Sequence, residues 1–66
     1  MDIRPITERE WIGLSLNDAE QKAEGIGYTT RVVEENGKSY MVTMDQKSNR
    51  LNFRLSNGKI IGLYTG

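Results

Sequence analysis

The sequence predicts an α+β fold in which a single helix packs on a small, largely antiparallel β-sheet. A helix start signal at Ser15 is followed by apolar residues at helical spacing. The second half of the chain instead holds short β-branched, aromatic or alternating stretches, separated by turns that contain Asn-Gly. A chain of 66 residues buries only about 60 % of its unfolded surface, which is enough for one modest core. Residues 1–66 are therefore expected to form a single domain without a deep substrate cavity.

The N-terminal stretch, residues 1–10, is expected to be irregular, because Pro5 interrupts it and no apolar period runs through it. Trp11 and Ile12 are the first strongly apolar pair and are expected to cover the core. The start of the chain has no basic region followed by an apolar one, so we expect no secretory leader and a cytoplasmic location, unless a leader has been removed. No transmembrane span and no membrane partner are expected.

A helix is predicted over residues 16–24. The hydroxyl of Ser15 can cap the free N–H groups of the first turn, and the carboxylate of Asp18 favours a helix N-terminus. Gly25 and Gly27 are natural terminators. The apolar face of this helix comprises Leu16, Ala19, Ala23 and Ile26.

A strand is predicted at residues 28–33, which are rich in β-branched and aromatic side chains. Asn36 and Gly37 then give a strong hairpin signal, so residues 40–42 are expected to return as a second strand. The following residues, 43–49, contain no apolar side chain except Met44 and are expected to form a loop.

Two more strands close the predicted sheet. Residues 51–55 alternate, which places Leu51, Phe53 and Leu55 toward the core. Residues 56–58 form a tight turn, and residues 59–64 form the last strand. On the face opposite the core lie Arg50, Asn52 and Arg54. The expected core residues are Trp11, Phe53, Leu55, Ile61 and Leu63.

The composition excludes several kinds of chemistry. The chain contains neither cysteine nor histidine. The domain is therefore disulfide-free, and thiolate zinc sites and the usual histidine-containing catalytic arrangements are excluded. No motif pairs two carboxylates for acid–base catalysis. We expect no enzyme activity, no cofactor and no metal.

The charge pattern gives no general reason to expect a nucleic-acid partner. The formal net charge is zero. Residues 1–35 hold eight acids and four bases, whereas residues 36–66 hold one acid and five bases. The five bases are spread along the chain rather than clustered, so no nucleic acid is expected as partner.

The most informative segment is the polar loop around Met44. An apolar side chain on a loop suits insertion into a partner's pocket, which is worth about 1.5–3 kcal/mol. Asp45 and Arg50 are close enough in sequence to meet at the base of the loop. Thr43 could also accept a hydrogen bond from the Arg50 guanidinium. Such contacts would hold both sides of the Met44–Asp45 bond.

A purely structural interpretation uses the same residues. Tyr40, Val42 and Met44 alternate, so Met44 could be the last inward residue of a strand. A surface Asp–Arg pair is common and contributes only about 0–1 kcal/mol. The pattern alone leaves both interpretations open.

The ordered set of motifs resembles a known inhibitor family. Residues 42–45 read Val-Thr-Met-Asp, residues 50–52 read Arg-Leu-Asn, and residues 63–66 read Leu-Tyr-Thr-Gly. The motif at residues 42–45, the following Arg50-Leu51 and the helix start at residues 12–19 resemble the potato inhibitor I family, which includes the seed chymotrypsin inhibitors. The bacterial and fungal elastase-inhibitor family related to it is more similar still. The resemblance spans residues 10–66.

The resemblance implies a mixed sheet with two parallel central strands and a projecting inhibitory loop. It implies an inhibitor of serine proteases with apolar specificity pockets, of the subtilisin, chymotrypsin or elastase type. We expect the chain to be a monomer. The implied reactive bond is Met44–Asp45. The protease-binding residues that the resemblance implies are Met41, Val42, Thr43, Met44, Asp45, Gln46 and Lys47. The loop-bracing residues that it implies are Thr43, Asp45, Arg50 and Asn52.

The chain departs from the two families at two positions. Thr65 stands where the elastase inhibitors have a cysteine, and Asn52 stands where the seed inhibitors have a second arginine. Bracing would then depend mainly on Arg50, with Asn52 as a neutral, shorter helper. The alternative function is a non-inhibitory protein-binding module on the same scaffold.

Overall fold

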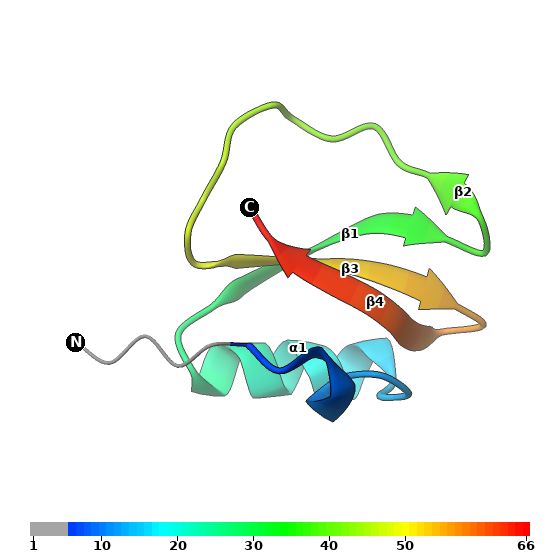
Figure 1. The fold of residues 1–66 in the computed structure, drawn as a ribbon, viewed down its shortest axis with the longest axis horizontal. Helices are drawn as coiled ribbons and strands as arrows, with labels where there is room; N and C mark the ends of the chain where they lie inside the picture. The colour runs from blue at the N-terminus through cyan, green and yellow to red at the C-terminus, as the bar shows by residue number, and fades with distance from the viewer. Residues whose placement is uncertain (1–5) are drawn as a thin grey trace.

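The computed structural model describes residues 6–66, over which one 3₁₀-helix, one α-helix and four strands follow one another (Figure 1). Pro5 and the four residues before it lie outside the described residues. The prediction of an irregular N-terminal stretch is wrong at residues 8–10, because the backbone N–H of Trp11 donates to Glu8 and closes a single helical turn. The elements are η1 (Glu8–Glu10), α1 (Leu16–Gly25), β1 (Thr29–Glu35), β2 (Lys38–Ser39), β3 (Arg50–Ser56) and β4 (Lys59–Thr65).

Helix α1 begins where the sequence predicts. Ser15 Oγ accepts a hydrogen bond from the backbone N–H of Asp18 at 3.2 Å, which satisfies one of the free donors of the first turn. The helix ends at Gly25, one residue beyond the predicted end. Gly27 follows with a φ of 82°, a conformation that glycine adopts without strain and that turns the chain toward β1.

The predicted apolar face of α1 is correct at its centre and wrong at its end. Ala19 and Ala23 are buried, and Leu16 packs against the core. Ile26 is exposed, because it lies beyond the last helical residue, where the helical period no longer sets the direction of a side chain.

The four strands of the described chain form one sheet in the order β2-β1-β3-β4. The β1–β3 pair is parallel, whereas the β1–β2 and β3–β4 pairs are antiparallel. Helix α1 lies along one side of this sheet (Figure 1). The α+β prediction is therefore confirmed, as is the mixed sheet with two parallel central strands that the resemblance implies. The largely antiparallel sheet that the strand and turn signals predict is wrong, because β1 and β3 run parallel.

The parallel β1–β3 pair explains why the chain must cross over the sheet. Two parallel strands need a connection that returns along their whole length, and a helix usually makes it. Here β2 and the segment after it make this return. This segment, residues 40–49, is called the crossover loop below. The loop arches on the side of the sheet away from α1, and the end of β4 points toward it (Figure 1).

The predicted Asn-Gly hairpin is present but short. Asn36 and Gly37 have φ values of 52° and 83°, as a two-residue hairpin turn requires. The returning strand β2 contains only Lys38–Ser39, so the prediction of a strand at residues 40–42 is wrong. The N–H of Tyr40 still donates to the carbonyl of Val33. The chain then leaves the sheet, because the remaining residues must cross to the start of β3.

The core lies between α1 and the sheet. Leu51, Phe53 and Leu55 are buried, as their alternation predicts. Trp11 is also buried, with its ring centroid 6.0 Å from that of Phe53. Its neighbour Ile12 is exposed, so the prediction that both cover the core is wrong: successive side chains of a tight turn point in different directions. The core cluster comprises Trp11, Ala19, Ala23, Leu51, Phe53, Leu55, Ile60 and Leu63.

A β-bulge corrects the prediction at Ile61. Arg54 pairs with Gly62 and Leu55 pairs with Ile60, which leaves Ile61 as an extra residue on β4. A bulge shifts the alternation of the strand that carries it. Ile60 is consequently buried, whereas Ile61 is exposed. Over residues 6–66, no helix has the length and apolar character needed to cross a membrane.

Candidate functional site

The crossover loop presents apolar side chains to solvent. Met44 is 95 % exposed and Met41 is 102 % exposed, and the chain bends at Met44. The structural interpretation in which Met44 ends a strand and faces inward is therefore wrong, since residues 40–49 belong to no strand. The exposed loop also includes the predicted partner-binding residues Val42, Thr43, Asp45, Gln46 and Lys47.

Both ends of the crossover loop are tied to β1. At its start, the N–H of Tyr40 donates to the Val33 carbonyl at 2.9 Å, and the Tyr40 hydroxyl donates to Glu35 Oε1 at 2.5 Å. At its end, the N–H of Thr29 donates to the Asn49 carbonyl at 2.8 Å. The exposed middle of the loop is therefore suspended between two fixed points.

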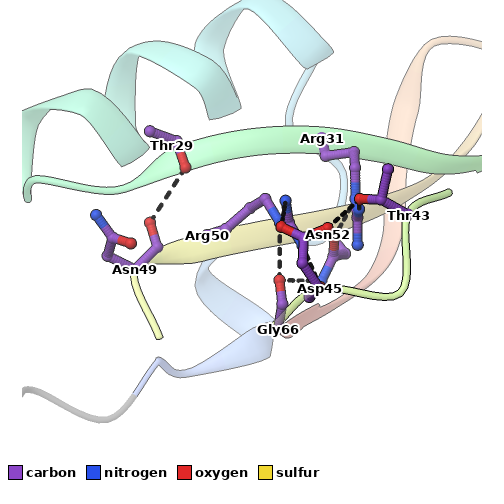
Figure 2. Close-up of polar contacts among 8 residues, drawn as sticks. All are labelled: Thr29, Arg31, Thr43, Asp45, Asn49, Arg50, Asn52 and Gly66. Carbon is purple, nitrogen blue, oxygen red and sulfur yellow. Dashed lines mark hydrogen bonds and ion pairs between the residues drawn. The ribbon is translucent and has the colours of Figure 1, made fainter. Parts of the chain in front are cut away.

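Arg50, at the start of β3, lies beneath the loop and is only 8 % exposed. Its Nη2 donates to the backbone carbonyl of Asp45 at 2.9 Å, and its Nη1 lies 3.4 Å from Asp45 Oδ2. Its Nε donates to the carbonyl of Gly66 at 2.8 Å. Figure 2 shows these contacts converging on the guanidinium from the loop and from the end of β4. One arginine thus joins the loop to the sheet.

Asn52, two residues further along β3, is fully buried. Its Nδ2 donates to the carbonyls of Tyr64 and Gly66, each at 3.3 Å. Its Oδ1 accepts a hydrogen bond from Arg31 Nε at 2.8 Å. Arg31 then reaches the loop, because its Nη1 donates to Thr43 Oγ1 at 3.2 Å (Figure 2). A second guanidinium therefore contacts the loop, and it comes from β1.

The two neighbours of Met44 are joined to each other. The hydroxyl of Thr43 donates to Asp45 Oδ1. Thr43 is held by Arg31 and Asp45 is held by Arg50, so the residues on both sides of Met44 are fixed to the sheet. Met44 projects between them into solvent.

Two of the predicted bracing contacts need correction. Asp45 meets Arg50 as predicted. Thr43, however, accepts its hydrogen bond from Arg31 rather than from Arg50, because the Arg50 guanidinium is occupied by Asp45 and Gly66. Asn52 makes no direct contact with the loop among its described hydrogen bonds; it contacts Arg31 instead.

Sequence reasoning missed Arg31 and the Gly66 carbonyl. Arg31 pairs with Asn52 across the parallel β1–β3 ladder, and residues in register on adjacent strands share one face of the sheet. Aligning the two strands in parallel would have placed an arginine beside Asn52. The carbonyl of Gly66 has no side-chain signal, and only the three-dimensional fold reveals it.

The hydroxyl of Thr43 lowers the pKa of the Asp45 carboxyl below its ordinary value, and the nearby charge of Arg50 lowers it further. The ionised form of Asp45 is therefore the one that the braced loop favours. Its contribution to loop order is fully present above the ordinary pKa of about 3.9. That contribution is lost as the pH falls through the lowered pKa.

Replacing Thr43 with valine is expected to raise the pKa of Asp45 toward its ordinary value, because the substitution removes the hydroxyl that lowers it most. The measurement is an NMR titration that follows the side-chain carboxyl carbon of Asp45. The variant T65V, at an exposed threonine on β4, is the control and should titrate like the wild type. Identical titrations of T43V and the wild type would contradict the assigned cause.

Within the described part of the chain, no cluster of three or more acidic residues is arranged to hold a metal ion. Comparison with known proteins gives no match among family models, curated proteins or solved structures. The contacts of the crossover loop and the pattern of the sequence are thus the basis for any functional assignment.

Proposed function

We propose that the chain is a substrate-like inhibitor of serine proteases with apolar specificity pockets, and that Met44–Asp45 is its reactive bond. The observation that carries the proposal is the geometry around Met44. Its side chain is 95 % exposed, while the residues on both sides of it are hydrogen-bonded to the sheet through Arg31 and Arg50. An apolar residue is thus presented on a constrained backbone.

A constrained loop lowers the cost of docking. Ordering a flexible segment upon binding costs about 0.5–1.5 kcal/mol for each side chain that is immobilised. The ties at Tyr40, Asn49 and Asp45 fix much of the crossover loop before any partner arrives. More of the interaction energy is then available as affinity.

In the proposed complex, Met44 fills the primary specificity pocket and its carbonyl oxygen enters the oxyanion hole. Residues 41–43 pair in extended form with the substrate-binding edge of the protease. This run lies on the exposed loop, outside the strands of the sheet, so its backbone is accessible to an added strand.

The same bracing opposes hydrolysis. When the enzyme attacks Met44, the new amine of Asp45 is retained, because Arg50 Nη2 binds the Asp45 carbonyl and Nη1 faces its carboxylate. Groups held in this way reach effective molarities on the order of 10⁵–10⁸ M. Attack of this amine on the acyl-enzyme re-forms the peptide bond and frees the enzyme, and it can therefore outpace hydrolysis of the acyl-enzyme by water.

The sequence supports the same assignment. The motif at residues 42–45 with the arginine at position 50 resembles the reactive segment of potato inhibitor I-like proteins. Methionine at the specificity position favours apolar pockets over those that carry an acid. Subtilisin-like, chymotrypsin-like and elastase-like enzymes are the proposed partners. No cofactor takes part in this mechanism.

Titration of the protein into subtilisin and chymotrypsin, followed with a chromogenic substrate, tests the proposal. Inhibition of at least one of these enzymes at micromolar protein or below is expected, with much weaker inhibition of trypsin. Absence of inhibition of both enzymes would overturn the proposal and favour a non-inhibitory binding module. Equal inhibition of trypsin would contradict the role of Met44.

A further inference from the structure

We infer that Arg31 is the second bracing residue of the crossover loop, and that it acts on the side of the reactive bond opposite to Arg50. The inference deepens the proposed function and depends on it for its inhibitory consequences. Its structural part, the fixing of Thr43 by Arg31, stands independently of any protease.

The register of the sheet places Arg31 for this task. Arg31 and Asn52 are partners across the parallel β1–β3 pair. Asn52 is fully buried, and its amide nitrogen is engaged with the carbonyls of Tyr64 and Gly66. Its oxygen is therefore directed at Arg31, whose Nε it binds at 2.8 Å. The buried amide sets the position of the half-exposed guanidinium.

The two arginines contact opposite sides of the Met44–Asp45 bond. Arg31 Nη1 binds the hydroxyl of Thr43 at 3.2 Å, on the acyl side of the Met44–Asp45 bond. Arg50 binds the carbonyl of Asp45, on the amine side. The hydrogen bond from Thr43 to Asp45 joins the two sides. Figure 2 shows the guanidinium groups arriving from different strands.

This division predicts different roles for the two arginines in the complex. Once a protease is bound, its pocket and its substrate-binding edge hold the acyl side themselves. The amine side has only the inhibitor scaffold to retain it. Arg31 should therefore act mainly before docking, by shaping the free loop, whereas Arg50 should also act after cleavage, by retaining the amine.

The variant R31Q separates the two contacts of Arg31. The side-chain amide nitrogen of glutamine occupies the same place along the chain as Nε of arginine, so it can keep the hydrogen bond to Asn52. It has no group that corresponds to Nη1 and cannot reach Thr43. R31Q thus removes the brace and leaves a partner for the buried amide. The variant R54A, at an exposed arginine of β3 that faces Glu34, is the matched control.

For R31Q, the dissociation constant with subtilisin is expected to rise about 10- to 100-fold, the equivalent of one lost hydrogen bond to a charged group. The rate of cleavage within the saturated complex should remain close to that of the wild type. The double variant R31Q/T43V should bind no more weakly than T43V alone, because both changes remove the same contact. R54A should leave both quantities unchanged.

A measurement on the free protein separates this inference from the proposed function. The ¹⁵N heteronuclear NOE of the Met44 amide should fall in R31Q and stay at the wild-type value in R54A. If the wild type inhibits no protease and R31Q still loosens the loop, Arg31 braces the loop and the inhibitor proposal fails. If R31Q leaves the NOE unchanged, or if R31Q and T43V add independently, the role of Arg31 is overturned.

Discussion

Replacing Arg50 with alanine is expected to turn the protein from an inhibitor into a slowly digested substrate. Arg50 is buried and joins the Asp45 carbonyl of the loop to the Gly66 carbonyl of the sheet. Each hydrogen bond from a charged donor to such a carbonyl contributes about 1.5–3 kcal/mol. Without them the new amine of Asp45 is free to leave after cleavage, and a displacement of about 1 Å slows rejoining by about 100-fold.

The measurement is the rate at which subtilisin cleaves the Met44–Asp45 bond, followed by mass spectrometry alongside the dissociation constant. The variant R54A removes an arginine from the same strand that is exposed and faces Glu34, and it should remain an inhibitor. A cooperative thermal unfolding transition of R50A is the control that this variant is folded. Weaker binding of R50A without faster cleavage would contradict the proposed retention of the amine.

Replacing Met44 with lysine is expected to redirect inhibition from subtilisin and chymotrypsin toward trypsin. Filling an apolar pocket with a side chain such as methionine contributes about 1.5–3 kcal/mol, and a lysine ammonium is costly to bury there. Inhibition of chymotrypsin should therefore weaken by at least about 100-fold, since each 1.4 kcal/mol is a factor of ten. A pocket that carries an acid should gain by a comparable factor.

Because Met44 is exposed, its replacement with lysine should not disturb the fold. Its side chain is 95 % exposed, so the change should leave the thermal unfolding midpoint unaltered. Met41 offers a matched control, because it is also almost fully exposed on the same loop and lies three residues before Met44. M41K should keep the preference of the wild type. If M44K inhibits chymotrypsin unchanged, or if M41K is the variant that switches preference, Met44 is misassigned.

Local signals in the sequence predict α1 and the three long strands β1, β3 and β4. The hydroxyl of Ser15 caps α1 as expected, and the alternation of residues 51–55 places three apolar side chains in the core. Each of these features depends on residues within one turn or one strand. The bulge at Ile61 is different, because the pairing of β3 with β4 creates it and neither strand shows it alone.

The candidate site was predictable only in part for the same reason. The exposed methionine and the contact between Asp45 and Arg50 involve residues close in sequence. The contact from Arg31 to Thr43 depends on the register of two parallel strands. That register is set by the packing of the whole sheet. The sequence of the loop alone therefore points to Arg50 as the donor to Thr43, whereas the donor is Arg31.

The conformation of the crossover loop also depends on the carbonyl of Gly66, which follows β4. It accepts hydrogen bonds from Arg50 and from Asn52, and the N–H of the same residue donates to Arg50. Strand ends are where native proteins open most readily. Fraying at the edge of the sheet would therefore remove the acceptor that holds Nε of Arg50, the same side chain whose Nη2 binds Asp45. Opening of the last strand and loss of rigidity at the exposed tip of the loop are therefore expected to accompany each other.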